Sequence, residues 1–164
     1  MDIYILRHAI AEDVSRTGKD RDRVLTDEGI RKTHEAGKAL KKLEITFDLV
    51  LSSPFARAWQ TAEIVVRELD CKKLLESCEP LGSGGPSSDL LAELKTASER
   101  ASSLLVVGHE PDLSGLISIL LSGSEEIAIT MKKGGLCKLV CASPEAGAAR
   151  LEWLLTPKQL CRIA

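Results

Sequence analysis

The stretch "YILRHAIAED", residues 4–13, decides the fold class and indicates a site. Its apolar and aromatic residues end directly on the cation Arg7 and the imidazole of His8. A short apolar run of this kind is typical of a buried strand. In an open parallel sheet, ligands bind beyond the carboxyl ends of the strands. We therefore expect Arg7 and His8 to lie at a binding site.

The rest of the chain alternates between strand-like and helix-like patterns. Buried parallel strands are predicted by three short apolar runs with turn-forming residues after them, at 2–7, 47–53 and 102–109,. Apolar residues at helical spacing predict helices at 25–43, 53–69, 88–99 and 111–123,. Thr26 is the expected N-cap of the first helix, and prolines are expected in the first turns of two others, at Pro54 and Pro111.

The last third of the chain differs, because it predicts strands without a helix between them. Residues 134–142 and 149–157 are expected to form an antiparallel hairpin with its turn at 143–147,. Together with the preceding alternation, this favours a three-layer α/β/α sandwich. Its central sheet would be mostly parallel, with a late antiparallel element.

Composition limits the class of protein. The 164 residues, 44% of them hydrophobic, predict a single domain over 1–164 with a substantial core,. Lys plus Arg number 22 and Asp plus Glu 24, so the net charge of −2 argues against general binding to nucleic acid or anionic membranes,. The longest apolar runs, such as 116–121, are too short to span a bilayer, and no secretory leader is recognised,. We expect a soluble cytoplasmic monomer.

Five cysteines occur without a CxxC pair, which favours neither a disulfide framework nor a zinc site,. We expect them to be reduced and mostly in the core. They are Cys71, Cys78, Cys137, Cys141 and Cys161.

Two arginines and two histidines are expected to meet at one edge of the sheet. Arg57 follows the second strand and His109 the third, as Arg7 and His8 follow the first. Any one of these alone would more often be a surface or structural group, but their convergence indicates a pocket for a phosphoryl group. His34, in the middle of a predicted helix, is expected to be exposed and structural.

Three motifs at these places resemble those of the histidine phosphatase superfamily, which includes the cofactor-dependent phosphoglycerate mutases. They are "LRHA" (6–9), "SSPFARAWQTA" (52–62) and "VGHEP" (107–111). Within the superfamily, "RVLTDEG" (23–29), "LEWLLTP" (151–157) and the short chain are similar to the SixA-type phosphohistidine phosphatases. The resemblance spans nearly the whole chain and implies a phosphoglycerate mutase-like fold.

The resemblance also implies roles for individual residues. His8 would be the nucleophile that becomes phosphorylated, Arg7 and Arg57 would bind phosphoryl oxygens, His109 would be the second pocket histidine, and Arg23 would help to hold the substrate. Two features depart from the family pattern. Ala9 stands where the family usually has glycine, and the acidic proton donor found after the third strand in many relatives has no clear counterpart in 74–91. Glu79 is the candidate for that acid.

The chemistry of phosphoryl transfer suits these residue types. Arginine supplies bidentate donors that stay charged, and neighbouring cations keep the imidazole of His8 neutral, as a nucleophile must be. A protonated His109 would donate to an oxygen on which charge builds up. No metal or cofactor is needed, and the scattered acids Glu12, Asp13 and Glu110 are interpreted as solvated or capping residues.

Three functions remain open at this stage. The first is a phosphatase that acts on a phosphohistidine-containing protein. The second is a phosphatase or mutase acting on a small phosphorylated substrate. A non-catalytic phosphate-binding module is disfavoured because all four core residues are present.

Overall fold

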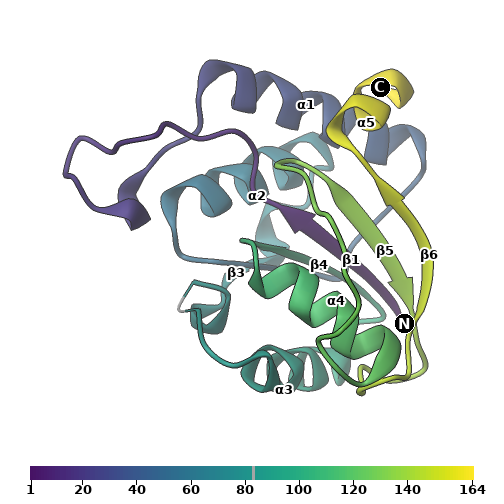
Figure 1. The fold of residues 1–164 in the computed structure, drawn as a ribbon. Helices are drawn as coiled ribbons and strands as arrows, with labels where there is room; N and C mark the ends of the chain where they lie inside the picture. Colours follow the sequence, from purple (N-terminus) through teal and green to yellow (C-terminus); the bar gives the residue numbers. More distant parts are fainter. Residues whose placement is uncertain (83) are drawn as a thin grey trace.

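The computed structural model describes residues 1–82 and 84–164, which form a six-stranded sheet with helices on both faces (Figure 1). The strands are β1 (Asp2–Arg7), β2 (Leu49–Ser52), β3 (Leu75–Ser77), β4 (Ser103–Gly108), β5 (Leu136–Val140) and β6 (Arg150–Leu155). Their order across the sheet is β3-β2-β4-β1-β5-β6. The first four run parallel, β5 pairs antiparallel with β1, and β6 pairs antiparallel with β5. The expected mostly parallel sheet with a late antiparallel hairpin is confirmed.

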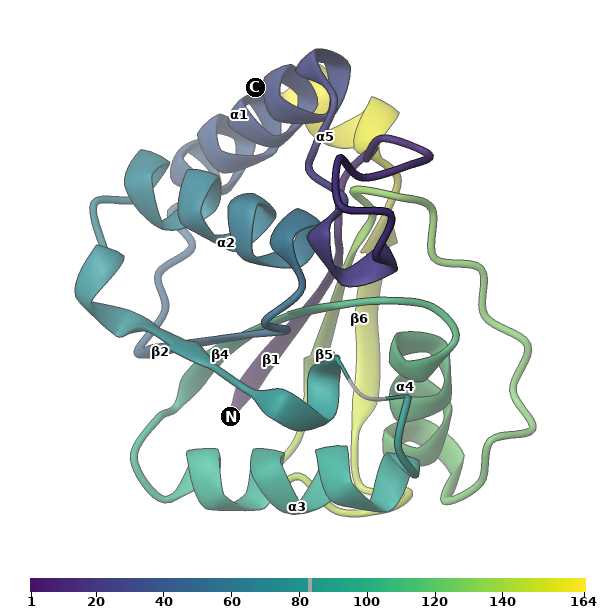
Figure 2. The same cartoon turned by 90° about the vertical axis from the view of Figure 1, so that its left-hand side faces the viewer.

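Helices cover the two faces of the sheet as separate layers (Figure 2). They are α1 (Asp27–Lys42), α2 (Ala56–Glu68), α3 (Ser87–Ser98), α4 (Asp112–Ser122) and α5 (Pro157–Ile163). Alternate side chains of the strands point into two cores. One core joins Tyr4, Val50 and Leu105 to α1, α2 and α5, and the other joins Ile5 and Val106 to α3 and α4. The three-layer prediction is confirmed.

The helix starts and late elements differ in detail from the sequence-based prediction. Thr26 is the N-cap of α1, as expected, and its side chain accepts a hydrogen bond from Gly29 N–H at 3.1 Å. The expectation of first-turn prolines is wrong, because Phe55 is the N-cap of α2, which leaves Pro54 outside the helix, and Pro111 is itself the N-cap of α4. Three short 3₁₀ turns were not predicted: Asp20–Asp22, Lys72–Leu74 and Glu79–Leu81.

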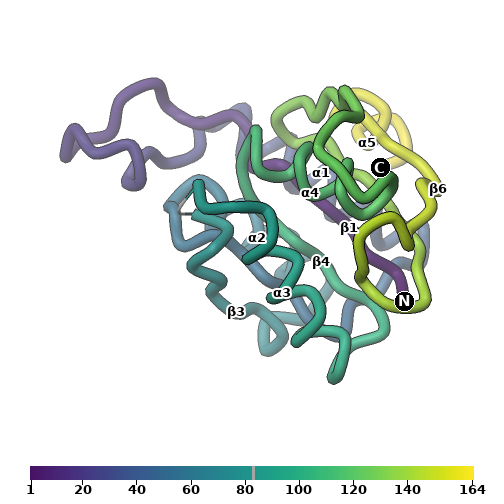
Figure 3. The backbone as a smooth tube through the Cα atoms, turned by 60° about the horizontal axis from the view of Figure 1, so that its bottom comes forward, coloured from purple at the N-terminus to yellow at the C-terminus, as the bar shows by residue number. Residues whose placement is uncertain are grey.

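The register of the parallel strands brings three chain segments level at one edge. Arg7 pairs with Gly108, and Ser52 pairs with Val107. The pairing continues past the strands, because His8 N–H donates to the Gly108 carbonyl at 3.0 Å and Ser53 N–H donates to the Val107 carbonyl at 2.9 Å. The residues that follow β1, β2 and β4 are therefore neighbours. From this edge the connection between β1 and α1 extends away from the sheet (Figure 3).

Across the part of the chain that is described, no helix combines the length and the apolar character that crossing a bilayer requires.

Candidate active site

The strand ends bring together the four residues predicted to form the pocket. Arg7 ends β1 and His8 follows it, Arg57 lies in the first turn of α2, and His109 follows β4. The rings of His8 and His109 are 5.0 Å apart between centroids. His8, Arg57 and His109 are only 5%, 7% and 8% exposed. The geometric part of the prediction is therefore met; the roles of the residues remain predictions.

The ring of His8 is hydrogen-bonded through Nδ1, which leaves Nε2 as the nitrogen available for reaction. Its Nδ1 lies 2.7 Å from the carbonyl oxygen of Ala9. Because a carbonyl only accepts, Nδ1 must carry the proton, and in the neutral ring the lone pair then lies on Nε2. Burial lowers the pKa of His8 to about 3, with smaller contributions from the charges of His109, Arg57 and Arg7, and against the Ala9 hydrogen bond,. His8 is neutral near pH 7, as a nucleophile must be.

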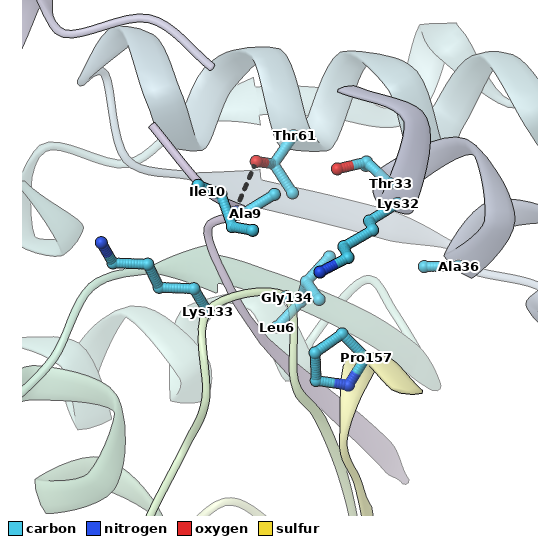
Figure 4. A pocket seen from close by; sticks show the side chains of 10 residues that line it. All are labelled: Leu6, Ala9, Ile10, Lys32, Thr33, Ala36, Thr61, Lys133, Gly134 and Pro157. Carbon is cyan, nitrogen blue, oxygen red and sulfur yellow. Dashed lines mark hydrogen bonds between the residues drawn. The ribbon is translucent and has the colours of Figure 1, made fainter. Parts of the chain in front are cut away.

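The backbone of this turn is fixed by α2. Ala9 N–H donates to Thr61 Oγ1 at 3.1 Å, which Figure 4 shows as the dashed line. Ala9 is 3% exposed, so its methyl group is packed in the interior of the protein at this turn. The small pocket drawn in Figure 4 lies beside this turn and has Lys32 and Lys133 among its lining side chains. It contains none of the four predicted pocket residues.

His109 differs from the expectation in its protonation. Burial, then the charge of Arg57, lowers its pKa to about 4, although Asp20 acts in the opposite direction,. The prediction of a protonated His109 is therefore wrong near pH 7, because burial outweighs the charge of Asp20. Its Nε2 lies 2.8 Å from Ser53 Oγ, and its Nδ1 is buried without a hydrogen-bond partner among the described residues.

The two arginines are held at their Nη atoms, while their Nε atoms remain unpaired among the described residues. Arg7 Nη1 donates to the Met131 carbonyl at 2.7 Å. Arg57 Nη1 and Nη2 donate to the main-chain oxygen and to Oδ2 of Asp20, at 2.8 and 3.0 Å. The Nε atoms of both arginines are buried, and no described residue accepts from them. Buried donors without a protein acceptor are costly, so the two Nε–H groups indicate a site for a ligand rich in acceptor oxygens,.

Asp20 is a further residue of the site, one that the sequence did not indicate. Besides Arg57, its carboxylate accepts from Arg23 Nη1 at 2.8 Å. The hydrogen bond from Arg23 is the largest cause that lowers the pKa of Asp20; burial acts in the opposite direction, and the charge and hydrogen bond of Arg57 lower the pKa further. Asp20 therefore links the predicted substrate-holding residue Arg23 to the pocket and stays ionised. The "KDRDR" stretch (19–23) carries no pattern that could have singled it out.

The other acidic side chains make no hydrogen bond to the four pocket residues in the described part of the chain. Glu79 is exposed on the 3₁₀ turn after β3. Glu12 and Asp13 are exposed as expected, and Glu110 Oε2 accepts from Ser114 Oγ in the first turn of α4 at 2.6 Å. Among described residues, no group of three or more His, Cys, Asp or Glu is placed to hold a metal ion.

The remaining predictions on single residues concern His34 and the cysteines. His34 is half-exposed and contacts Glu68 on α2 at 2.7 Å, so it links two helices away from the pocket, in line with the structural interpretation. All five cysteines are free, and Cys78, Cys137 and Cys141 are buried. The expectation of mostly buried thiols is met.

Comparison with known proteins gives a family match over the first half of the chain and relatives over nearly its full length. A family model described as "Histidine phosphatase superfamily (branch 1)" matches residues 3–78. The chain is 33% identical over 154 residues to an uncharacterized protein of Picosynechococcus sp., covering 93% of this chain and 89% of that protein. It is 30% identical over 166 residues to the phosphohistidine phosphatase SixA of Escherichia coli (strain K12), covering 98% and 96%.

Solved structures agree with the sequence matches. The protein histidine phosphatase SixA complexed with tungstate superimposes with a TM-score of 0.84 at 27% identity, covering 98% of this chain and 99% of that one. A phosphoglycerate mutase from Bacillus anthracis gives a TM-score of 0.75 at 18% identity, covering 99% and 96%, which is a likeness of fold alone. The predicted phosphoglycerate mutase-like fold is confirmed.

Proposed function

Because the chain belongs to the histidine phosphatase superfamily, we propose that it is a phosphohistidine phosphatase acting through a covalent intermediate on His8. Its substrate would be a protein phosphorylated on histidine. The proposal includes a metal-independent, monomeric enzyme formed by a single domain over 1–164 that works in the cytoplasm. Similarity to SixA over nearly the full length of both chains supports it.

The first chemical step uses the lone pair of His8. The phosphoryl oxygens would accept from Arg7 and Arg57, whose bidentate donors stabilise charge spread over three oxygens. Nε2 of His8 attacks phosphorus, a new P–N bond forms, and the P–N bond of the substrate breaks. The departing imidazole keeps the bond electrons, which a proton already on its ring neutralises.

The second step returns the enzyme to its starting state. Water attacks phosphorus in line from the side opposite His8, and the P–N bond to His8 breaks. The electrons of that bond return to Nε2 as a lone pair, and inorganic phosphate leaves with the oxygen of water. The proton released by water passes to phosphate or to solvent. Two moderate barriers thus replace a single high one.

The state of Asp20 is the observation that favours phosphohistidine over an alkyl phosphate. An alkoxide is a poor leaving group unless a protonated acid is in place, whereas a phosphorylated imidazole can be protonated on its own ring. Asp20 is the carboxylate whose charge reaches His109, and two arginines hold it ionised. An ionised carboxylate cannot donate the proton that an alkoxide needs.

The test compares kcat/KM for a phosphohistidine-containing protein and an aryl phosphate with that for sugar and glycerate phosphates. We expect turnover of the first two and poor turnover of the others, both in the parent and in Glu79→Gln. Efficient sugar-phosphate hydrolysis that collapses in Glu79→Gln would favour the small-molecule enzyme instead. Binding of all of these without turnover would favour the non-catalytic module.

A further inference from the structure

The environment of Ser53 restricts how its hydroxyl group can bond. Ser53 directly follows β2 and has no exposed surface. Its Oγ accepts from Phe55 N–H at 3.2 Å and lies 2.8 Å from His109 Nε2. Among the described residues, Ser53 Oγ has no other hydrogen-bond partner than these two. An N–H group can only donate, so this hydrogen bond from Phe55 occupies one lone pair of Ser53 Oγ,.

Two arrangements of the remaining proton are possible, and they differ in what they leave unpaired. If His109 donates from Nε2, the Ser53 hydroxyl proton has no acceptor among the described residues. His109 Nδ1 is then a buried lone pair, also without a partner. If Ser53 donates to Nε2 instead, the hydroxyl is fully paired and only the Nδ1 proton awaits an acceptor. A buried polar group without a partner costs stability, so the second arrangement is favoured.

We propose that Ser53 is a positioning residue, which donates its hydroxyl proton to His109 Nε2 and thereby fixes the Nδ1–H tautomer that presents a donor to a phosphoryl oxygen. The tautomer is independent of the proposed function, and only its catalytic use rests on that function. The ring that carries this donor lies 5.0 Å, between centroids, from the ring of the proposed nucleophile His8. The Nδ1–H group joins Arg7 Nε and Arg57 Nε as a third buried donor without a protein acceptor.

The inference accounts for how a neutral histidine can still assist the reaction. Since the pKa of His109 is lowered to about 4, its ring carries one proton near pH 7, and the tautomer decides which nitrogen holds it,. The charged and titratable groups that act on His109 are Arg57, Asp20, Arg7, Arg23 and His8. None of them contacts a ring nitrogen of His109, whereas Ser53 does.

Nitrogen NMR of the free protein tests the tautomer directly. The chain has three histidines, and with ¹⁵N-labelled rings the signals of His109 are those missing in His109→Asn. We expect a protonated Nδ1 and an unprotonated Nε2 in the parent, and a population with protonated Nε2 in Ser53→Ala. A protonated Nε2 in the parent, or an unchanged tautomer in Ser53→Ala, would overturn the inference. The parent measurement does not depend on the folding of Ser53→Ala.

Ser52→Ala is the matched control, because Ser52 is equally buried and its hydroxyl donates to the Ser53 carbonyl at 3.1 Å rather than to His109. It should keep the parent tautomer of His109. Any change of tautomer in Ser52→Ala equal to that in Ser53→Ala would show a general effect of packing and contradict the inference.

Activity on an aryl phosphate supplies a second readout. Removing an oxyanion donor outright costs about a hundredfold to a thousandfold in kcat, so we expect Ser53→Ala, which only misplaces the proton, to lose on the order of tenfold at pH 7.5. The ratio of parent to Ser53→Ala should shrink toward pH 4.5, because a protonated His109 donates from both nitrogens. A ratio that does not change with pH would show that Ser53 only packs. The expected tautomer in a protein without any phosphatase activity would instead contradict the proposed function and leave the inference standing.

Discussion

Acidification should destabilise this protein through the same two histidines that form the pocket. His8 and His109 have pKa values lowered to about 3 and about 4 from the ordinary value of 6.5. Between these values and 6.5 the unfolded chain takes up protons that the folded chain does not. The unfolded state therefore binds more protons, and stability is lost as the pH falls through this range.

The magnitude follows from the distance between pH 5.0 and the ordinary pKa of 6.5. At about 1.36 kcal/mol for each pH unit, each histidine should lower the free energy of unfolding by about 2 kcal/mol between pH 7.5 and 5.0. Both folded-state values lie below pH 5.0, so the two contributions add to about 4 kcal/mol. Ionised carboxylates contribute less in this range, because most of their titration occurs below pH 5.

Urea unfolding followed by tryptophan fluorescence at the two pH values measures this difference. His8→Asn and His109→Asn should each reduce the loss of stability by about 2 kcal/mol, and the double variant should remove most of it. The carboxylates are common to all variants and cancel in the comparison. His34→Asn, at the half-exposed contact with Glu68, is the matched control and should retain the full loss.

Equal losses in the parent and in both pocket variants would refute the reasoning. They would mean that His8 and His109 are not buried neutral groups. The argument that the Nε2 lone pair of His8 is available near pH 7 would then lose its physical basis.

Further predictions concern the reaction itself. After brief exposure to labelled substrate, the parent should trap a phosphoryl label that is stable in base and lost in acid; His8→Ala should have neither label nor turnover, while His34→Ala keeps both. Arg57→Ala should lose about 3 kcal/mol of transition-state stabilisation, on the order of a hundredfold in kcat/KM, and Arg57→Lys should recover only part because an ammonium cannot hold Asp20 and the phosphoryl group together. Loss of the charge-assisted bond in Asp20→Ala should cost about tenfold in kcat/KM, with a smaller cost in Asp20→Asn, and higher activity in Asp20→Ala would instead show that Asp20 competes with the substrate. Activity should be unchanged after dialysis against a strong chelator; a requirement for added metal would contradict the mechanism.

The parts of the fold that the sequence predicted are those decided by local pattern. The runs that became β1, β2 and β4 are continuous apolar segments buried from both faces, and Thr26 is a cap that acts within its own helix. Strand β3 lacks such a pattern, since it has three residues and two of them are exposed; its pairing with β2 defines it. Helix α5 was not predicted although Thr156 and Gln159 form a capping box, because it has only seven residues and begins at the end of the run 149–157, which predicts a strand.

The residues of the site also fall into those that local pattern predicts and those that it does not. Arg7, His8, Arg57 and His109 were predictable because their segments end on the same edge of a parallel sheet. Asp20 and Ser53 were not, since each matters through one contact with a residue far along the chain: Asp20 with Arg57, 37 residues away, and Ser53 with His109, 56 residues away. Sequence spacing carries no information on such contacts. The charge of His109 was predicted wrongly because burial, its main determinant, is a property of the folded chain.

The two pocket histidines illustrate how one environment can supply two different chemical roles. Burial and the neighbouring arginines keep both rings neutral, so charge does not distinguish them. Their hydrogen-bond partners do. The Ala9 carbonyl can only accept, so it takes the Nδ1 proton of His8 and leaves a lone pair on Nε2,. A hydroxyl can donate, and in the tautomer proposed for His109, Ser53 donates to Nε2 and leaves a proton on Nδ1. One ring then offers electrons to phosphorus and the other a proton to a phosphoryl oxygen, a difference that depends on a backbone carbonyl in one case and a serine side chain in the other.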